Sequence, residues 1–194
     1  MNTADKLTTV RIILAPLFCV VYLVPAWSEQ VWTVPVLWVI FIVSELTDML
    51  DGMVARKQKI VSDFGKLFDP FADTLTQITY FFCFILDGIL PVPLFLLVVY
   101  REFGILFVRN LMLRRGVTLG ARMGGKIKTV TYIAAAALAL LAASVRRLRF
   151  FDDAAGSRVF SLVSIAATVV FALSVLLAIL SFADYVKVYR KGKT

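Results

Sequence analysis

The sequence has no histidine among its 194 residues and only two cysteines, Cys19 and Cys83. The lack of histidine excludes every mechanism that needs an imidazole as base, nucleophile or metal ligand. Acid–base chemistry must therefore use carboxylates, lysines, tyrosines or metal-bound water. The two cysteines lie in apolar runs, without the spacing of a metal or redox motif. We expect both to be reduced thiols inside apolar segments.

Charged residues are also scarce, at 18% of the chain against 60% hydrophobic residues, and the mean hydropathy is +0.87. A soluble domain is about half apolar, and several runs here approach or exceed the roughly 18–20 apolar residues that span a bilayer. The first run, residues 9–27, is too long for a typical signal-peptide core and lacks a clear cleavage site, so we expect a mature helix. Residues 1–194 are predicted to form a single polytopic membrane domain.

The hydrophobic pattern predicts an all-α integral membrane protein with six transmembrane helices. We expect these helices at about residues 8–27, 31–55, 70–90, 92–113, 127–145 and 157–184. Four glycines make the segment RRGVTLGARMGG, residues 114–125, a predicted polar loop between the fourth and fifth helices.

The distribution of positive charge predicts the orientation of the chain in the membrane. The formal net charge is +8, and a cytoplasmic N-terminus places fifteen of the 21 lysines and arginines on the cytoplasmic side. The fifteen are Lys6, Arg11, Arg56, Lys57, Lys59, Lys66, Arg114, Arg115, Arg122, Lys126, Lys128, Lys187, Arg190, Lys191 and Lys193. We expect basic loops resting on anionic headgroups. Nucleic acid is not an expected partner, because no separate basic domain exists to dock it.

Four aspartates lie close together in the segment DMLDGMVARKQKIVSDFGKLFDPFAD, residues 48–73. Asp48 and Asp51 are three residues apart and share one face of the expected second helix. Asp69 and Asp73 are four apart and share one face of the expected third helix. Pro70 suits the first turn of that third helix, and a link over residues 56–68 turns the chain back. The two pairs of carboxylates are therefore predicted to converge.

Four neighbouring carboxylates repel one another, and burial at a membrane boundary makes their ionisation costlier. Protonation relieves this repulsion, and so do divalent cations. Ligands that are all oxygen select hard ions such as Mg²⁺ or Mn²⁺ over zinc. Two such ions about 4 Å apart form a clamp for phosphoryl or phosphodiester chemistry. The competing interpretation is a set of solvated loop acids paired with nearby lysines and arginines, which is how we interpret Asp63 alone.

Small residues and one arginine accompany the aspartates. Gly52, Ala55 and Gly65 carry little or no side chain, which allows either close helix packing or room for a flat base or a diphosphate. Arg56 follows Ala55 and can bind phosphate oxygens as a bidentate donor. Both interpretations of the small residues remain open at this point.

The spacing of these residues resembles the signature of the CDP-alcohol phosphotransferases in every fixed position. In this chain the pattern is Asp48-x2-Asp51-Gly52-x2-Ala55-Arg56-x8-Gly65-x3-Asp69-x3-Asp73. The resemblance implies a six-helix membrane bundle, usually a homodimer, in which an alcohol displaces CMP from a CDP-linked substrate. It also implies two divalent cations, Mg²⁺ or Mn²⁺, held by the four aspartates. Asp73 would act as the base, Gly52, Ala55 and Gly65 would line the cytidine pocket, and Arg56 would contact the diphosphate.

Three further segments resemble the subfamily that makes phosphatidylglycerophosphate from CDP-diacylglycerol and glycerol 3-phosphate. They are LTTVRIILAP at residues 7–16, YREFGILFVRN at residues 100–110 and GGKIKT at residues 124–129. This resemblance implies CDP-diacylglycerol, glycerol 3-phosphate and CMP as partners, with membrane lipid around the protein. We also expect a bacterial inner membrane, with the active site on the cytoplasmic side that the charge distribution predicts.

Basic residues within the later helices independently favour a phosphorylated acceptor. Arg101 and Arg109 lie near one face of the expected fourth helix, and Lys126 and Lys128 lie at the start of the expected fifth. An arginine in a membrane is costly without an acid, and Glu102 cannot neutralise both arginines. A phosphate dianion satisfies several such donors at once, so we expect these four residues to bind the acceptor phosphate. Snorkelling to the interface is the alternative.

Other functions remain open at this stage. The same chemistry with inositol phosphate as the acceptor, or a CDP-choline or CDP-ethanolamine phosphotransferase, would use the same aspartates. A cation transporter with the aspartates on the ion path is an alternative of a different class. The lack of an inverted repeat counts against the transporter.

Overall fold

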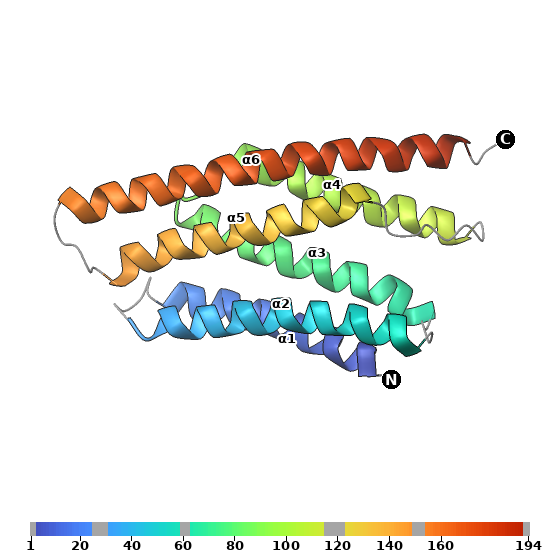
Figure 1. The fold of residues 1–194 in the computed structure, drawn as a ribbon, viewed down its shortest axis with the longest axis horizontal. Coiled ribbons are helices and arrows are strands. Elements are labelled where there is room, and N and C mark those ends of the chain that lie inside the picture. Colours follow the sequence, from blue (N-terminus) through green and yellow to red (C-terminus); the bar gives the residue numbers. More distant parts are fainter. Residues whose placement is uncertain (1–2, 25–30, 59–62, 115–122, 149–153, 192–194) are drawn as a thin grey trace. The chain divides into compact units, whose positions relative to one another are not determined.

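The computed structural model describes residues 3–24, 31–58, 63–114, 123–148 and 154–191. Within these ranges the protein consists of helices and no strands (Figure 1). The helices are α1 Thr3–Leu23, α2 Thr33–Gln58, α3 Asp63–Leu86, α4 Val92–Arg114, α5 Met123–Leu148 and α6 Ala154–Lys191. Helices suit apolar segments in lipid, because a helix satisfies every backbone hydrogen bond within one segment.

Four stretches within the described residues are long and apolar enough to cross a membrane. They are Lys6–Leu23 in α1, Thr33–Leu50 in α2, Ile127–Leu148 in α5 and Ala155–Lys187 in α6. Neither α3 nor α4 is among them, because aspartates occupy the first half of α3 and three charged residues occupy the middle of α4. The predicted class, an all-α integral membrane protein, is confirmed.

Several predicted boundaries are wrong. The link between α2 and α3 comprises only residues 59–62, so α3 begins at Asp63 and Pro70 lies inside it rather than in its first turn. An interior proline removes one helical hydrogen bond, and membrane helices tolerate this where neighbouring groups satisfy the freed carbonyl. Gly124 and Gly125 lie in the first turn of α5 rather than in a loop. The rest of the predicted polar loop, residues 115–122, lies outside the described residues.

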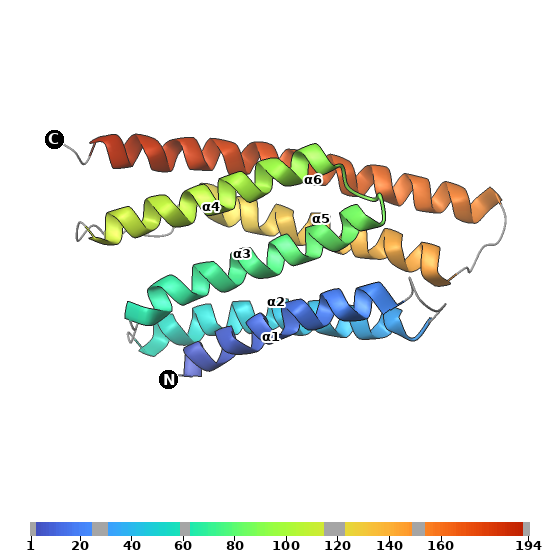
Figure 2. The ribbon, with the colours of Figure 1, turned by 180° about the vertical axis from the view of Figure 1, so that it is seen from behind.

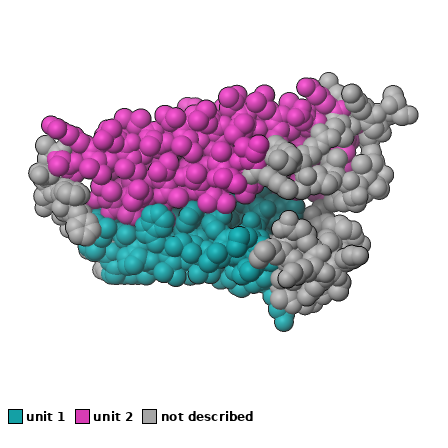
Figure 3. Space-filling model, viewed as in Figure 1, with its two compact units in different colours: residues 1–83, 147–149 teal, residues 84–146, 150–194 magenta. Residues whose placement is uncertain are grey.

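The chain divides into two compact units, which Figure 3 colours separately. Unit 1 comprises residues 1–83 and 147–149, and unit 2 comprises residues 84–146 and 150–194. Unit 1 therefore contains α1, α2 and most of α3, whereas unit 2 contains α4, α6 and most of α5. The single domain expected from the sequence stays a prediction.

Aromatic side chains form the core of unit 1, where α1 and α2 pack side by side (Figures 1 and 2). The ring centroid of Tyr80 in α3 lies 4.5 Å from that of Phe18 in α1 and 5.4 Å from that of Phe41 in α2. All three side chains are buried. One aromatic cluster therefore joins α1 to α2 and α3, the two helices that carry the aspartates.

Small residues of α5 contribute to the core of unit 2. Ala135, Ala139 and Ala142 of α5 are fully buried, which is typical of helices that pack closely in a membrane. α4 and α6 also approach closely, because a Cβ added at Gly104 of α4 would lie 3.0 Å from Cζ of Phe182 in α6. The charged residues of α4 are thus held in a tightly packed unit.

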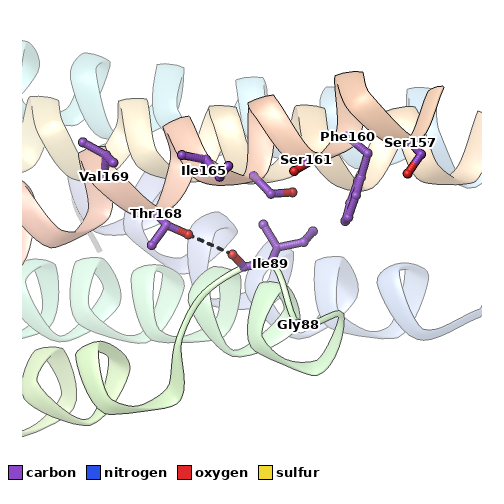
Figure 4. Close-up of a pocket in the computed structure, with 9 residues that line it drawn as sticks. Gly88, Ile89, Ser157, Phe160, Ser161, Ile165, Thr168 and Val169 are labelled. Atoms are coloured by element: carbon purple, nitrogen blue, oxygen red, sulfur yellow. Dashed lines mark hydrogen bonds between the residues drawn. The ribbon is translucent and has the colours of Figure 1, made fainter. Parts of the chain in front are cut away.

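A glycine ends α3. Gly88 has a φ of 69°, its N–H donates to the Ile85 carbonyl at 2.8 Å, and the Ile89 N–H donates to the Phe84 carbonyl at 2.9 Å. This pattern is the Schellman motif, which needs a left-handed residue. A groove of about 390 Å³ lies between this turn and α6. The Thr168 hydroxyl donates to the Ile89 carbonyl there at 3.2 Å (Figure 4). The hydroxyl thereby attaches the turn to α6.

Candidate active site

The aspartate cluster of unit 1 is organised by two residues of α1. Arg11 donates through Nη1 to Oδ1 of Asp48 in α2 and to Oδ1 of Asp73 in α3. The Thr8 hydroxyl donates to Oδ1 of Asp69 in α3 at 2.6 Å. Three of the four predicted metal ligands therefore bond to one short segment of α1.

The helical repeat explains why one turn of α1 serves two aspartates of α3. Thr8 and Arg11 are three residues apart and lie on one face of α1, whereas Asp69 and Asp73 are four apart and lie on one face of α3. Each polar residue of α1 thus meets one aspartate, Thr8 with Asp69 and Arg11 with Asp73. Asp69 and Asp73 therefore share one face of α3 as predicted, and the residues that bond to them come from α1, a helix that the signature does not include.

Burial is unequal within the cluster. The side chain of Arg11 is 3% exposed, whereas those of Asp48 and Asp73 are 36% and 42% exposed. A buried guanidinium without a carboxylate is costly, and Arg11 has two. The carboxylates remain reachable from outside the unit, as ligands for a soluble substrate or an ion must be.

A fifth acid lies near the cluster. Glu45 precedes Asp48 by three residues on α2, is half-buried, and lies within electrostatic range of Asp48, Asp73 and Arg11. The sequence prediction omitted it because it stands outside the signature. Its three-residue spacing from Asp48 was the available signal.

The donor set fits a hard divalent cation. Asp48 and Asp73 both reach the same positively charged group, Asp69 lies one turn away on α3, and all the available ligand atoms are oxygens. Among the side chains that the structure describes, no three acids, cysteines or histidines form a metal-binding group. The side chain of Asp51 lies outside the described residues, so the predicted site for two cations stays a prediction.

Most of the predicted nucleotide-binding residues are placed only by their backbone. Gly52, Ala55 and Arg56 lie within α2, which continues to Gln58, and their side chains are outside the described residues. Gly65 is buried near the start of α3. Arg56 was expected in the link and is instead helical, so α2 carries the whole first half of the signature.

Unit 2 contains a buried charge cluster formed by Arg101, Glu102 and Lys128, here called the α4–α5 cluster. Oε1 of Glu102 accepts from Nη1 of Arg101 at 2.8 Å and from Nζ of Lys128 at 2.7 Å. Arg101 also donates through Nε to the Ala178 carbonyl of α6 at 3.1 Å. Lys128 lies 4.5 Å from the ring centroid of Tyr132.

The other predicted acceptor residues are placed differently. The guanidinium of Arg109 lies 5.8 Å from the ring centroid of Tyr185 in α6, which is a cation–π distance. Lys126 lies in the first turn of α5, and its side chain is outside the described residues. Glu102 was expected to be unable to neutralise both arginines. In the structure it pairs with Arg101 and Lys128, a role that the sequence did not indicate.

Comparison with known proteins identifies relatives along nearly the whole chain. The profile of the CDP-alcohol phosphatidyltransferase family matches residues 1–180. A CDP-diacylglycerol–glycerol-3-phosphate 3-phosphatidyltransferase of Treponema pallidum is 35% identical over 97% of this chain and 89% of its own length. An enzyme of the same name from Bacillus subtilis is 33% identical over 72% of this chain and 77% of its own length. A probable phosphatidylglycerophosphate synthase of Mycobacterium tuberculosis is 30% identical over 95% of this chain and 80% of its own length.

Proposed function

The chain belongs to the CDP-alcohol phosphatidyltransferase family, and on that premise we propose that it transfers a phosphatidyl group from CDP-diacylglycerol to glycerol 3-phosphate. The products are phosphatidylglycerophosphate and CMP. The names of relatives that cover most of this chain favour glycerol 3-phosphate over the other acceptors and over ion transport. The structural observation that carries the proposal is the convergence of Asp48 and Asp73 on one positive charge.

In this proposal the four aspartates, Asp48, Asp51, Asp69 and Asp73, hold two divalent cations, Mg²⁺ or Mn²⁺. When bound, such cations neutralise a diphosphate and the charge that develops on the departing CMP. The hydrogen bond from Thr8 to Asp69 and the ion pairs of Arg11 hold three of these carboxylates in fixed orientations. Preorganised ligands of this kind lower the cost of binding.

Asp73 is the proposed base. The hydroxyl oxygen of glycerol 3-phosphate forms a bond to the lipid-side phosphorus of CDP-diacylglycerol, and the bond from that phosphorus to the oxygen of CMP breaks. The hydroxyl proton passes to a carboxylate oxygen of Asp73, which is accessible at 42% exposure. Gly52, Ala55 and Gly65 line the space for cytidine, and Arg56 binds the diphosphate.

The acceptor phosphate is bound by Arg101, Arg109, Lys126 and Lys128. Support comes from the α4–α5 cluster, where Arg101 and Lys128 come from different helices and meet at one oxygen of Glu102. Two donors suited to phosphate oxygens therefore lie close together. Arg109 adds a guanidinium on the same helix as Arg101.

The position of the enzyme in the membrane follows from its lipid substrate, CDP-diacylglycerol. CDP-diacylglycerol enters from the cytoplasmic leaflet with its acyl chains in lipid, and the spans expose apolar side chains such as Ile13 and Val20, at 62% and 61%. We place the enzyme in a bacterial inner membrane with its active site toward the cytoplasm. We also propose that the enzyme is a homodimer, as the family resemblance implies.

The decisive assay measures CMP release by the purified protein in detergent with CDP-diacylglycerol. Radiolabelled acceptors are supplied one at a time, with Mg²⁺ or with EDTA. We expect release with glycerol 3-phosphate and Mg²⁺, and none with EDTA. Release with inositol phosphate alone would assign a different acceptor, and cation flux in sealed vesicles without nucleotide would replace the enzymatic proposal.

A further inference from the structure

Glu102 stands between two cations in the interior of unit 2. Its Oε1 accepts from Arg101 Nη1 at 2.8 Å and from Lys128 Nζ at 2.7 Å. The exposures of Arg101, Glu102 and Lys128 are only 6%, 3% and 7%. One carboxylate oxygen therefore sets the distance between two buried positive groups that come from different helices.

The two cations are also held on their other sides. Arg101 Nε donates to the Ala178 carbonyl on α6 at 3.1 Å, and Lys128 lies over the Tyr132 ring one turn along α5. An arginine has five N–H donors in a rigid fork, and the bonds to Glu102 and Ala178 use two of them. Because the guanidinium of Arg101 is planar and rigid, these two bonds also determine the directions of its remaining N–H donors.

We propose that Glu102 is a positioning residue for the acceptor phosphate, which it serves by fixing Arg101 and Lys128 at one separation and orientation. This inference rests on the proposed function, in which those two cations bind glycerol 3-phosphate. Glu102 itself does not touch the phosphate, because two anions repel. It reduces the charge of the pair from two to one and thereby allows both cations to remain buried before the acceptor arrives.

Two other roles for Glu102 predict different results. A carboxylate that only stabilises the fold would change the melting temperature and the amount of active enzyme without changing the Michaelis constant for either substrate. A carboxylate that only opposes the binding of anions would, when removed, lower the KM for glycerol 3-phosphate. A positioning residue raises that KM when it is removed, because the two cations move apart.

The first experiment measures kcat and both KM values for wild type, Glu102→Gln and Glu102→Asp. Glutamine keeps the length and an acceptor oxygen but loses the charge, whereas aspartate keeps the charge on a shorter side chain. We expect the KM for glycerol 3-phosphate to rise about tenfold or more in Glu102→Gln and by less in Glu102→Asp. The KM for CDP-diacylglycerol should stay within about twofold of wild type.

Asp87→Asn is the matched control. Asp87 also pairs with an arginine of unit 2, Arg146, at 2.5 Å, and it belongs to neither proposed site. We expect both KM values of this variant to match wild type. An equal rise in the KM for glycerol 3-phosphate in Asp87→Asn and Glu102→Gln would overturn the inference, since any broken ion pair of the unit would then have the same effect.

The second experiment is a double-mutant cycle with Lys128→Met, which keeps the apolar stem of the lysine. If Glu102 acts through Lys128, adding Glu102→Gln to Lys128→Met should raise the KM for glycerol 3-phosphate by less than about threefold. Full additivity of the two changes would contradict the inference. If Glu102→Gln alone does not fold, Glu102→Asp keeps a carboxylate beside Arg101 and Lys128 and remains available for measurement, and an unchanged KM for glycerol 3-phosphate in that variant would contradict the inference.

These experiments separate the two levels of the proposal. If wild type releases no CMP with glycerol 3-phosphate, the proposed function fails. If wild type does so and Glu102→Gln leaves or lowers the KM for glycerol 3-phosphate, only the positioning role of Glu102 fails.

Discussion

Arg11 and Asp73 are 62 positions apart in the chain and form an ion pair in unit 1, and the same nitrogen of Arg11 also bonds to Asp48. A guanidinium that is 3% exposed thus unites acids from α2 and α3. It shows which carboxylates are close enough to share one cation.

Replacing Arg11 by methionine should destabilise the protein when no divalent cation is present. Without the guanidinium, Asp48 and Asp73 repel each other, and because both are partly exposed the expected loss is about 1–3 kcal/mol. The melting temperature in detergent with EDTA reports the loss. Added Mg²⁺ should restore part of it if the carboxylates bind cations. Lys6→Met, at an exposed position of the same helix, is the control and should melt like wild type.

Asp48→Asn and Asp69→Asn should each abolish turnover, with a loss of more than about 100-fold in kcat, because each removes a charged oxygen ligand worth several kcal/mol. Asp63→Asn should retain wild-type activity, since Asp63 stands outside the signature. Steady-state CMP release measures all three variants. Equal activity in the three would remove the assignment of the aspartates as metal ligands.

Removal of metal should stop the reaction reversibly. EDTA should eliminate CMP release, and Mg²⁺ or Mn²⁺ should restore it, whereas Zn²⁺ should not, because an oxygen-only ligand set favours hard ions. The measurement is the initial rate after dialysis and addition of each ion. A rate unaffected by EDTA would contradict the proposed cofactors.

Arg109→Ala should raise the KM for glycerol 3-phosphate about tenfold or more and leave the KM for CDP-diacylglycerol nearly unchanged. Loss of the contact with Tyr185 alone affects packing and not acceptor binding. Arg158→Ala, an exposed arginine of α6, is the matched control. If Arg109→Ala changes neither constant, the acceptor phosphate is bound elsewhere.

Gly88→Ala should cost about 1–2 kcal/mol of stability through the backbone alone. The residue has a φ of 69°, and an added Cβ would meet nothing within 4 Å, so no steric contact contributes. Gly88→Asn should cost less, because asparagine tolerates the left-handed region better. Melting temperatures in detergent test both variants, and equal losses for alanine and asparagine would point to a cause other than φ.

Helix boundaries were the part of the fold that local pattern predicted least well. Proline is common in the first turn of a helix, and Pro70 nevertheless lies inside α3. Gly124 and Gly125 are typical of loops, and they lie in the first turn of α5. In each case the preferences of one or two residues were outweighed by the length of apolar helix around them.

The sequence also predicted only some of the residues of the candidate site. The aspartates could be chosen because their spacing of three and four residues is a property of a single helix. Arg11 and Thr8 were not chosen, although both lie in the segment LTTVRIILAP that resembles the subfamily, since hydropathy does not distinguish a buried arginine in α1 from one that reaches the interface. Glu102 was noticed only as a nearby acid, because its bond to Lys128 joins residues 26 positions apart.

Composition and periodicity by themselves determined that this chain is an all-α membrane protein and that its acids lie on matched helical faces. These properties depend on the residues within one segment, which the sequence states directly. Only the tertiary structure decided that Arg11 pairs with Asp48 and Asp73, and that Glu102 joins Arg101 to Lys128. The partner of a buried charge is chosen by the packing of distant helices, because the cost of leaving that charge unpaired is incurred only after the helices meet.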